Sequence, residues 1–126
     1  MLKDLEIIAV LPAKDIARAG SFYRDMLGLE PAESLDEENL MYRCGKGTAF
    51  LLYKTDNAGT AKNTQMGWAT GDIEAEMKDL RGRGVVFEEY DFPGLKTENG
   101  IAQTPFGKAA WFTDSEGNIL NLFQHQ

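Results

Sequence analysis

The residues that could carry acid–base, nucleophilic or metal chemistry are few in this sequence and lie far apart. His125 is the only histidine and Cys44 is the only cysteine. A cysteine needs a nearby base to become a catalytic thiolate, and no histidine lies near Cys44 in the sequence. No group of His, Cys and Glu residues has the close spacing of metal ligands. These patterns therefore predict no catalytic residue, no metal site and no cofactor.

A neutral polar side chain is the more informative feature. The stretch AAWFTDSEGNILNLFQ, residues 109–124, reads as a strand, a tight turn and a second strand. Asn121 lies inside the second strand, between Leu120 and Leu122, where an apolar residue is expected. A buried amide needs a hydrogen-bond partner, and this partner is either a ligand or another group such as the amide of Gln65 or a water molecule. The sequence leaves these alternatives open.

Two helices must position these strands. The first helix is predicted to begin after Asp15, a good N-cap, and to end near Gly28. The second is predicted to begin after Asp72 and to end near Gly84. The two Asp–Gly spacings are 13 and 12 residues, and both helices start with Asp-Ile. We interpret this pattern as an internal repeat of about 57 residues.

Strands surround both helices in the same order. Turn residues separate the apolar runs, and Asp114 and Asn118 are expected to form the turn of the closing hairpin. The segment 93–102 is either a lid over a ligand or a plain connection. We expect two repeats, residues 1–54 and 64–126, joined by the polar linker 55–63. Besides the closing hairpin, strands are predicted over residues 5–11, 39–44, 48–54, 65–70 and 85–89.

Length and charge exclude several classes of protein. A chain of 126 residues is the size of one domain, and a single cysteine gives no internal disulfide and suits a reducing compartment. The formal net charge of −7 argues against nucleic acid and anionic membrane surfaces as partners. No apolar run approaches the roughly 20 residues of a membrane span. We therefore expect a cytoplasmic, soluble protein.

Three stretches together resemble the vicinal oxygen chelate superfamily, which includes glyoxalase I, bleomycin-binding proteins, fosfomycin-resistance enzymes and extradiol dioxygenases. They are AVLPAKDIARAGSFYRDMLGLE, ATGDIEAEMKDLRGRGVVFEE and AAWFTDSEGNILNLFQ. The resemblance implies an α+β fold of two βαβββ modules that form a partial barrel with a concave ligand cleft. It also implies a homodimer, because members of the superfamily commonly dimerise.

In metal-dependent members of this superfamily, four cleft positions hold a divalent ion. The resemblance places these positions at Ile8, Leu52, Gln65 and Asn121. Two of these side chains have no donor atom, and the other two offer only neutral amide oxygens, whereas divalent ions prefer charged oxygens, imidazole or thiolate. We therefore expect the cleft to bind no metal.

Strand alternation extends this set to a ligand-binding surface. Trp68 has the opposite parity to Gln65 and is expected under a helix, while Glu6 is expected on a solvated rim. The surface is predicted to be largely apolar with a few neutral hydrogen-bonding groups, as is usual for small-molecule sites. Its expected ligand-binding residues are Ile8, Phe50, Leu52, Gln65, Trp111, Thr113, Asn121 and Phe123.

Three functions are compatible with these observations. The first is a metal-free protein that binds an aromatic or cationic small molecule, such as an antibiotic, and so confers resistance. The second is a glyoxalase- or dioxygenase-like enzyme, a lyase or oxidoreductase, with an atypical site. The third is an interaction module without a small ligand. The absent metal donors favour the first.

Overall fold

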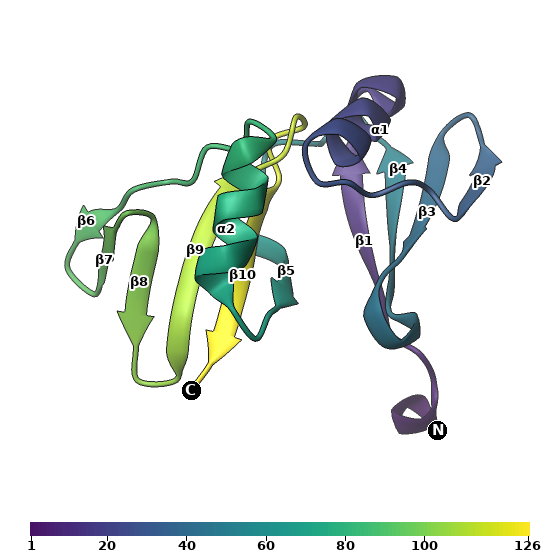
Figure 1. Ribbon diagram of the computed structural model, residues 1–126. Helices are drawn as coiled ribbons and strands as arrows, with labels where there is room; N and C mark the ends of the chain where they lie inside the picture. The colour runs from purple at the N-terminus through teal and green to yellow at the C-terminus, as the bar shows by residue number, and fades with distance from the viewer. The chain divides into compact units, whose positions relative to one another are not determined.

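The computed structural model describes residues 1–126, with all side chains except those of Ser34 and Leu35. The backbone divides into two units (Figure 1). Unit 1 comprises Met1–Thr60 together with Ser115–Asn118, and unit 2 comprises Ala61–Asp114 together with Ile119–Gln126. Each unit contains one α-helix and one sheet. None of the described helices has the length and apolar character needed to cross a membrane.

Unit 1 is a strand–helix–three-strand module. Its four-stranded sheet has the order β1-β4-β3-β2, in which β1 and β4 are parallel and the other neighbours are antiparallel. The expected hairpin around Gly45–Gly47 is confirmed. The elements are η1 (Leu2–Asp4), β1 (Ile8–Ala13), α1 (Ile16–Asp25), β2 (Glu33–Asp36), β3 (Asn39–Arg43), η2 (Gly45–Gly47) and β4 (Ala49–Lys54).

The N-cap and the glycine stop predicted for α1 are both present. The side chain of Asp15 accepts a hydrogen bond from the backbone N–H of Arg18 at 3.0 Å. After the helix, Gly28 adopts a positive φ of 71°, and the N–H of Leu29 returns to the carbonyl of Tyr23. Glycine reaches this backbone region without steric cost, so the chain can turn back towards the sheet.

The core of unit 1 is aromatic and lies between α1 and its sheet. Tyr23 of α1 packs against Tyr42 and Phe50, whose rings stack with centroids 4.7 Å apart. Phe50 and Leu52 are buried with Leu11 on this helix-covered side. The sequence prediction that Phe50 and Leu52 line the opposite, open side of β4 is therefore wrong. Long aromatic side chains fill the space under α1, and this packing sets the parity of the strand.

Unit 2 begins with the same strand–helix order and ends with more strands. Its sheet has the order β5-β10-β9-β8-β7-β6, with β5 and β10 parallel and the other neighbours antiparallel. The closing hairpin is confirmed, and Asp72 caps α2 through the N–H of Ala75 at 3.1 Å. The elements are β5 (Thr64–Ala69), α2 (Ile73–Gly82), β6 (Asp91–Phe92), β7 (Leu95–Glu98), β8 (Ile101–Thr104), β9 (Gly107–Thr113) and β10 (Ile119–His125).

Two segments of unit 2 differ from the sequence prediction. Residues 85–89 form no strand, although the N–H of Glu88 bonds to the carbonyl of Trp111 at 2.8 Å. The segment 93–102 forms most of the hairpin β7–β8 instead of a lid. Its turn is Asn99-Gly100, in which both residues have positive φ, as the tight turns favoured in β-hairpins require.

The core of unit 2 lies between α2 and the sheet. Leu120 and Leu122 of β10 are buried together with Phe112 of β9. Trp68 stacks on Phe112 with centroids 6.3 Å apart, which confirms that it packs on the helix-covered side. From α2, Met77 is buried in the same core, in company with Ile73 and Leu80. The alternate residues of β9 and β10 therefore face the open side of the sheet.

Candidate ligand-binding face

The open side of the unit 2 sheet is built by three neighbouring strands. Asn121 lies opposite Trp111 on β9 and opposite Gly67 on β5. Trp111 and Asn121 are both half-buried, whereas the alternate residues are buried under α2. We call this surface the unit 2 open face. Its residues on the three strands are Thr64, Gly67, Ala69, Ala109, Trp111, Thr113, Ile119, Asn121, Phe123 and His125.

Trp111 is held in a fixed orientation on this face. Its indole Nε1–H donates to the hydroxyl of Thr64 at 2.9 Å, two strands away. Tyr90 meets the indole edge-on, with centroids 5.8 Å apart and an interplanar angle of 74°, and Phe92 contacts Tyr90 in turn at 5.9 Å. Burial raises the pKa of Tyr90, so this ring stays a neutral phenol. The result is a preorganised aromatic surface.

The carboxamide of Asn121 lies directly over Gly67. A Cβ atom added to Gly67 would overlap Oδ1 of Asn121 and would lie 2.9 Å from its Cγ. No hydrogen bond joins this carboxamide to any other residue within the described part of the chain. A side-chain amide has both donors and an acceptor. Asn121 therefore offers both to whatever contacts the open face.

Gln65 was predicted to face a ligand, but in the structure it accepts a hydrogen bond from the backbone. The register of β5 against β10 shifts between Ile119 and Leu120, so Gln65 falls at the irregularity. Its Oε1 accepts the backbone N–H of Ile119 at 3.0 Å. Gly67, which sequence analysis passed over, takes the position opposite Asn121. A glycine inside a strand often marks a close approach, and that signal was available in the sequence.

The open side of unit 1 carries the first predicted residue, Ile8. In the parallel register Ile8 shares a face with Val10, and both side chains are exposed. Leu51 and Tyr53 of β4 have the same parity, so they hold the positions that were predicted for Phe50 and Leu52. This apolar surface is called the unit 1 open face.

The polar part of the unit 1 open face comes from its hairpin. Arg43 pairs in register with Ala49, and its guanidinium forms an ion pair with Glu33 at 3.2 Å. The opposite charges of this pair cancel, and both side chains are about half exposed. Such a pair adds little affinity by itself because solvent screens it.

The four positions to which the resemblance assigns metal ligands do not fit a divalent ion here. Ile8 has no donor atom, Leu52 is buried under α1, and Gln65 is engaged with a backbone N–H. Only the neutral amide of Asn121 remains, and one such oxygen does not offset the desolvation of a divalent ion. Among the side chains that the structure describes, no group of three His, Cys, Asp or Glu residues could hold a metal ion.

A buried carboxylate that sequence analysis missed lies in the turn between β9 and β10. Glu116 belongs to unit 1, and its side chain has no exposed surface. It accepts the backbone N–H groups of Lys14 and Asp15, both at 2.9 Å, and it pairs with the guanidinium of Arg18 at 2.8 Å. These contacts anchor the turn at the N-terminal end of α1.

The pKa of Glu116 reflects two opposing effects. Burial by itself would raise the pKa of this carboxyl. The hydrogen bonds from Arg18, Asp15 and Ser115, together with the charge of Arg18, outweigh burial and lower the pKa to about 2. Glu116 is therefore a structural anion, and it is far from a general acid at neutral pH.

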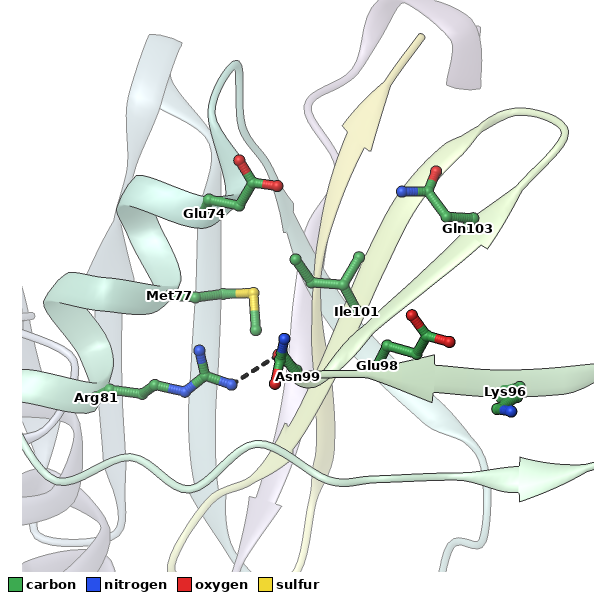
Figure 2. A pocket seen from close by; sticks show the side chains of 8 residues that line it. All are labelled: Glu74, Met77, Arg81, Lys96, Glu98, Asn99, Ile101 and Gln103. Carbon is green, nitrogen blue, oxygen red and sulfur yellow. Dashed lines mark hydrogen bonds between the residues drawn. The ribbon is translucent and has the colours of Figure 1, made fainter.

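A hollow lies on the helix-covered side of the unit 2 sheet, between α2 and the hairpin β7–β8 (Figure 2). Its volume is about 530 Å³. Arg81 closes one end by donating to the carbonyl of Asn99 at 2.8 Å. The lining of the hollow contains positive, negative and apolar side chains, so it does not indicate one class of ligand. It is lined by Glu74, Met77, Arg81, Lys96, Glu98, Asn99, Ile101 and Gln103.

Several solved structures are similar to this chain in fold. The bleomycin-binding protein from bleomycin-producing Streptomyces verticillus, solved with copper(II)-bleomycin, is 25% identical with a TM-score of 0.73, and 100% of both chains is covered. TnmS3, an antibiotic binding protein from Streptomyces sp. CB03234, is 23% identical with a TM-score of 0.70, over 97% of this chain and 96% of that chain. Lactoylglutathione lyase from Agrobacterium tumefaciens is 18% identical with a TM-score of 0.69, over 95% and 92%.

The sequence of the chain matches a known family as a whole and no individual curated protein. No curated protein matches the chain. The structural likenesses confirm the expected α+β fold of the glyoxalase and bleomycin-resistance type. The model of one family matches residues 7–122, which is most of the sequence. The chain therefore belongs to the Glyoxalase/Bleomycin resistance protein/Dioxygenase superfamily.

Proposed function

We propose that this protein binds an aromatic or cationic small molecule without the help of a metal ion. The observation that carries the proposal is the orientation of Trp111, fixed by Thr64 and Tyr90 so that its indole ring spans the unit 2 open face. A rigid aromatic surface stacks planar ligands at little entropic cost, and it also attracts cations through its π-system.

The polar groups beside Trp111 suit binding better than catalysis. Thr113 and Asn121 provide neutral hydrogen-bonding groups, while Ile119 and Phe123 provide apolar contact. The only titratable side chain that β5, β9 and β10 place on this face is that of His125, at the exposed end of β10. A lyase or oxidoreductase would need an acid, a base or a metal within reach of its substrate. Sequestration is therefore the better proposal.

Two similar proteins suggest the kind of ligand. One was solved with copper(II)-bleomycin, and the other is described as an antibiotic binding protein. By this likeness we propose that the ligand is an antibiotic or a compound of similar size, and that binding confers resistance. On unit 1, taken by itself, we propose that the open face with Ile8, Leu51 and Tyr53 is a second apolar surface able to contact a small molecule. A single cysteine supports a cytoplasmic location.

The test is binding to metal-free protein. We expect bleomycin or a bicyclic aromatic such as quinoline to bind saturably after treatment with EDTA, as measured by calorimetry or ligand-observed NMR. Trp111→Leu should weaken binding about fivefold or more, because one stacked aromatic contact is worth about 1 kcal/mol. Trp68→Leu is the matched control, since Trp68 lies under α2 and should retain the affinity.

Two results would contradict this proposal. Unchanged affinity in Trp111→Leu, or an equal loss in both tryptophan variants with folding intact, would argue against the open face as the binding surface. A tightly held stoichiometric metal ion in purified protein, required for binding or turnover, would favour the enzyme alternative.

A further inference from the structure

Gly67 and Asn121 form a small arrangement that the proposed function does not yet explain. They lie opposite each other in the parallel register of β5 and β10. Any side chain at position 67 would overlap Oδ1 of Asn121 and would also lie 2.9 Å from the backbone carbonyl oxygen of that residue. A glycine inside a strand weakens the strand, so its presence calls for a close approach that compensates. Here the approaching group is a carboxamide.

The carboxamide of Asn121 has both donors and an acceptor, but it makes no hydrogen bond within the described part of the protein. Its oxygen accepts and its NH₂ group donates, so it can pair with a ligand that presents the complementary donor and acceptor. Asn121 is half-buried, and its register partner on β9 is Trp111. A ligand stacked on the indole ring would therefore place a polar substituent near the carboxamide.

The charge of the surroundings narrows the ligand class. The strands β5, β9 and β10 place no carboxylate, lysine or arginine among the described residues of this face. His125 lies at the exposed end of β10, and Glu89, in the segment beside Trp111, already accepts a hydrogen bond from the hydroxyl of Thr97. Next to Asn121 these three strands therefore offer no ion-pair partner to an ammonium or a carboxylate on the ligand, and each would lose part of its hydration. An uncharged group that both donates and accepts hydrogen bonds loses much less hydration free energy.

We infer that Gly67 positions the Asn121 carboxamide to recognise an uncharged donor–acceptor group, such as a primary amide, on an aromatic ligand. The inference rests on the proposed function and narrows it, because it selects neutral aromatic ligands over cationic ones. Asn121 is the recognition residue, and Gly67 is a positioning residue that acts through Asn121.

Three probes of the same shape test this selection. Benzamide, benzamidinium and benzoate differ in the charge and hydrogen-bonding capacity of one substituent. We expect benzamide to bind wild-type protein about five- to tenfold more tightly than either ion, which is the effect of about one hydrogen bond. Asn121→Asp should reverse this preference, because an aspartate accepts both N–H groups of benzamidinium and has no donor for benzamide.

Gly67→Ala tests the positioning role with Asn121 intact. We expect the preference for benzamide to disappear and the side-chain NH₂ signals of Asn121 to shift in ¹⁵N NMR spectra. Gly71→Ala is the matched control. Gly71 follows the same strand, has an ordinary φ, and has no atom within 4 Å of an added Cβ, so both readouts should be unchanged.

The outcomes separate this inference from the function on which it rests. Equal affinities for the three probes, or a Gly67→Ala protein that behaves like Gly71→Ala, would overturn the inference and leave aromatic binding in place. The same holds if quinoline binds wild-type protein and benzamide does not. If no aromatic compound binds at Trp111, the proposed function fails and the inference fails with it.

Discussion

At the scale of single residues, Glu116 combines burial with an ion pair and several hydrogen bonds. A carboxylate without solvent exposure is stable only when hydrogen bonds and an opposite charge replace its hydration. Here two backbone N–H groups and the guanidinium of Arg18 supply both. Gly117, next to Glu116, has a positive φ of 85°, and an added Cβ would lie 3.0 Å from the Cα of Gly59. The turn therefore requires a glycine and a carboxylate side by side.

Acid titration tests the role of Glu116. In the folded protein the pKa of this carboxyl is about 2, against an ordinary value of 4.5. Because the unfolded chain takes up the proton first, Glu116 stabilises the fold above pH 4.5, and this contribution of about 3 kcal/mol is lost as the pH falls towards 2. We expect Glu116→Gln to lower the free energy of unfolding by about 2–3 kcal/mol at pH 7.

The measurement is urea unfolding at several pH values. Between pH 4.5 and 2 the variant should lose less stability than wild type, because the group that titrates has been removed. Arg18→Gln is the control: it should cost less, about 1 kcal/mol, because Arg18 is half exposed and the backbone donors to Glu116 remain. Parallel pH curves for wild type and Glu116→Gln would contradict this account.

At the scale of elements, one arginine joins the end of α2 to the hairpin β7–β8. Arg81 donates to the carbonyl of Asn99, and its guanidinium lies 5.2 Å from the centroid of the Phe87 ring. Gly100, in the same turn, has a positive φ of 81°, and an added Cβ would lie 3.0 Å from both Arg81 and Met77, so any other residue would be strained and tightly packed there. The helix and the turn are therefore in close contact, although they are distant in sequence.

Replacing Arg81 should loosen this contact. We expect Arg81→Ala to lower the free energy of unfolding by about 1–2 kcal/mol, because the solvent-exposed hydrogen bond to Asn99 and the cation–π contact are each worth about 0.5–1 kcal/mol. Hydrogen exchange should accelerate in β7 and β8. Arg83→Ala is a matched control at the C-cap of α2, where an exposed ion pair with Asp79 is worth at most about 0.5 kcal/mol. Equal effects of the two substitutions would argue against the contact.

At the scale of the whole molecule, apolar side chains are exposed along the N-terminal segment. Ile7 is 88% exposed, and it is followed in β1 by the exposed Ile8 and Val10. Monomeric proteins rarely expose a continuous apolar patch, so such a surface favours association. This supports the homodimer that the family resemblance implies, which we retain as a proposal.

Sedimentation tests the proposed dimer. We expect a species of twice the 14.0 kDa chain mass, and Ile7→Glu should raise the dissociation constant at least tenfold because it places a charge in an apolar contact. Val86→Glu is the control, since Val86 is 79% exposed in unit 2 and lies outside the N-terminal segment. A monomer at micromolar concentration would rule the dimer out.

The sequence by itself determined the parts of this protein that depend on local signals. The N-caps Asp15 and Asp72, the hairpin around Gly45–Gly47 and the closing hairpin were all predictable, because capping and turn formation involve neighbours along the chain. The placement of Trp68 on the helix-covered side followed from strand alternation. The combination of these elements also identified the family.

Only the tertiary structure decided which side of a strand a residue faces where core packing or a strand irregularity changes the simple alternation. Phe50 and Leu52 lie under α1 because an aromatic core fills that space, and a one-residue change of parity reverses a whole strand. The register shift beside Gln65 places Gly67 opposite Asn121, and the Glu116 site joins residues about one hundred positions apart. Such contacts leave no local pattern, because they are fixed by the shape of the core and by which buried groups satisfy each other.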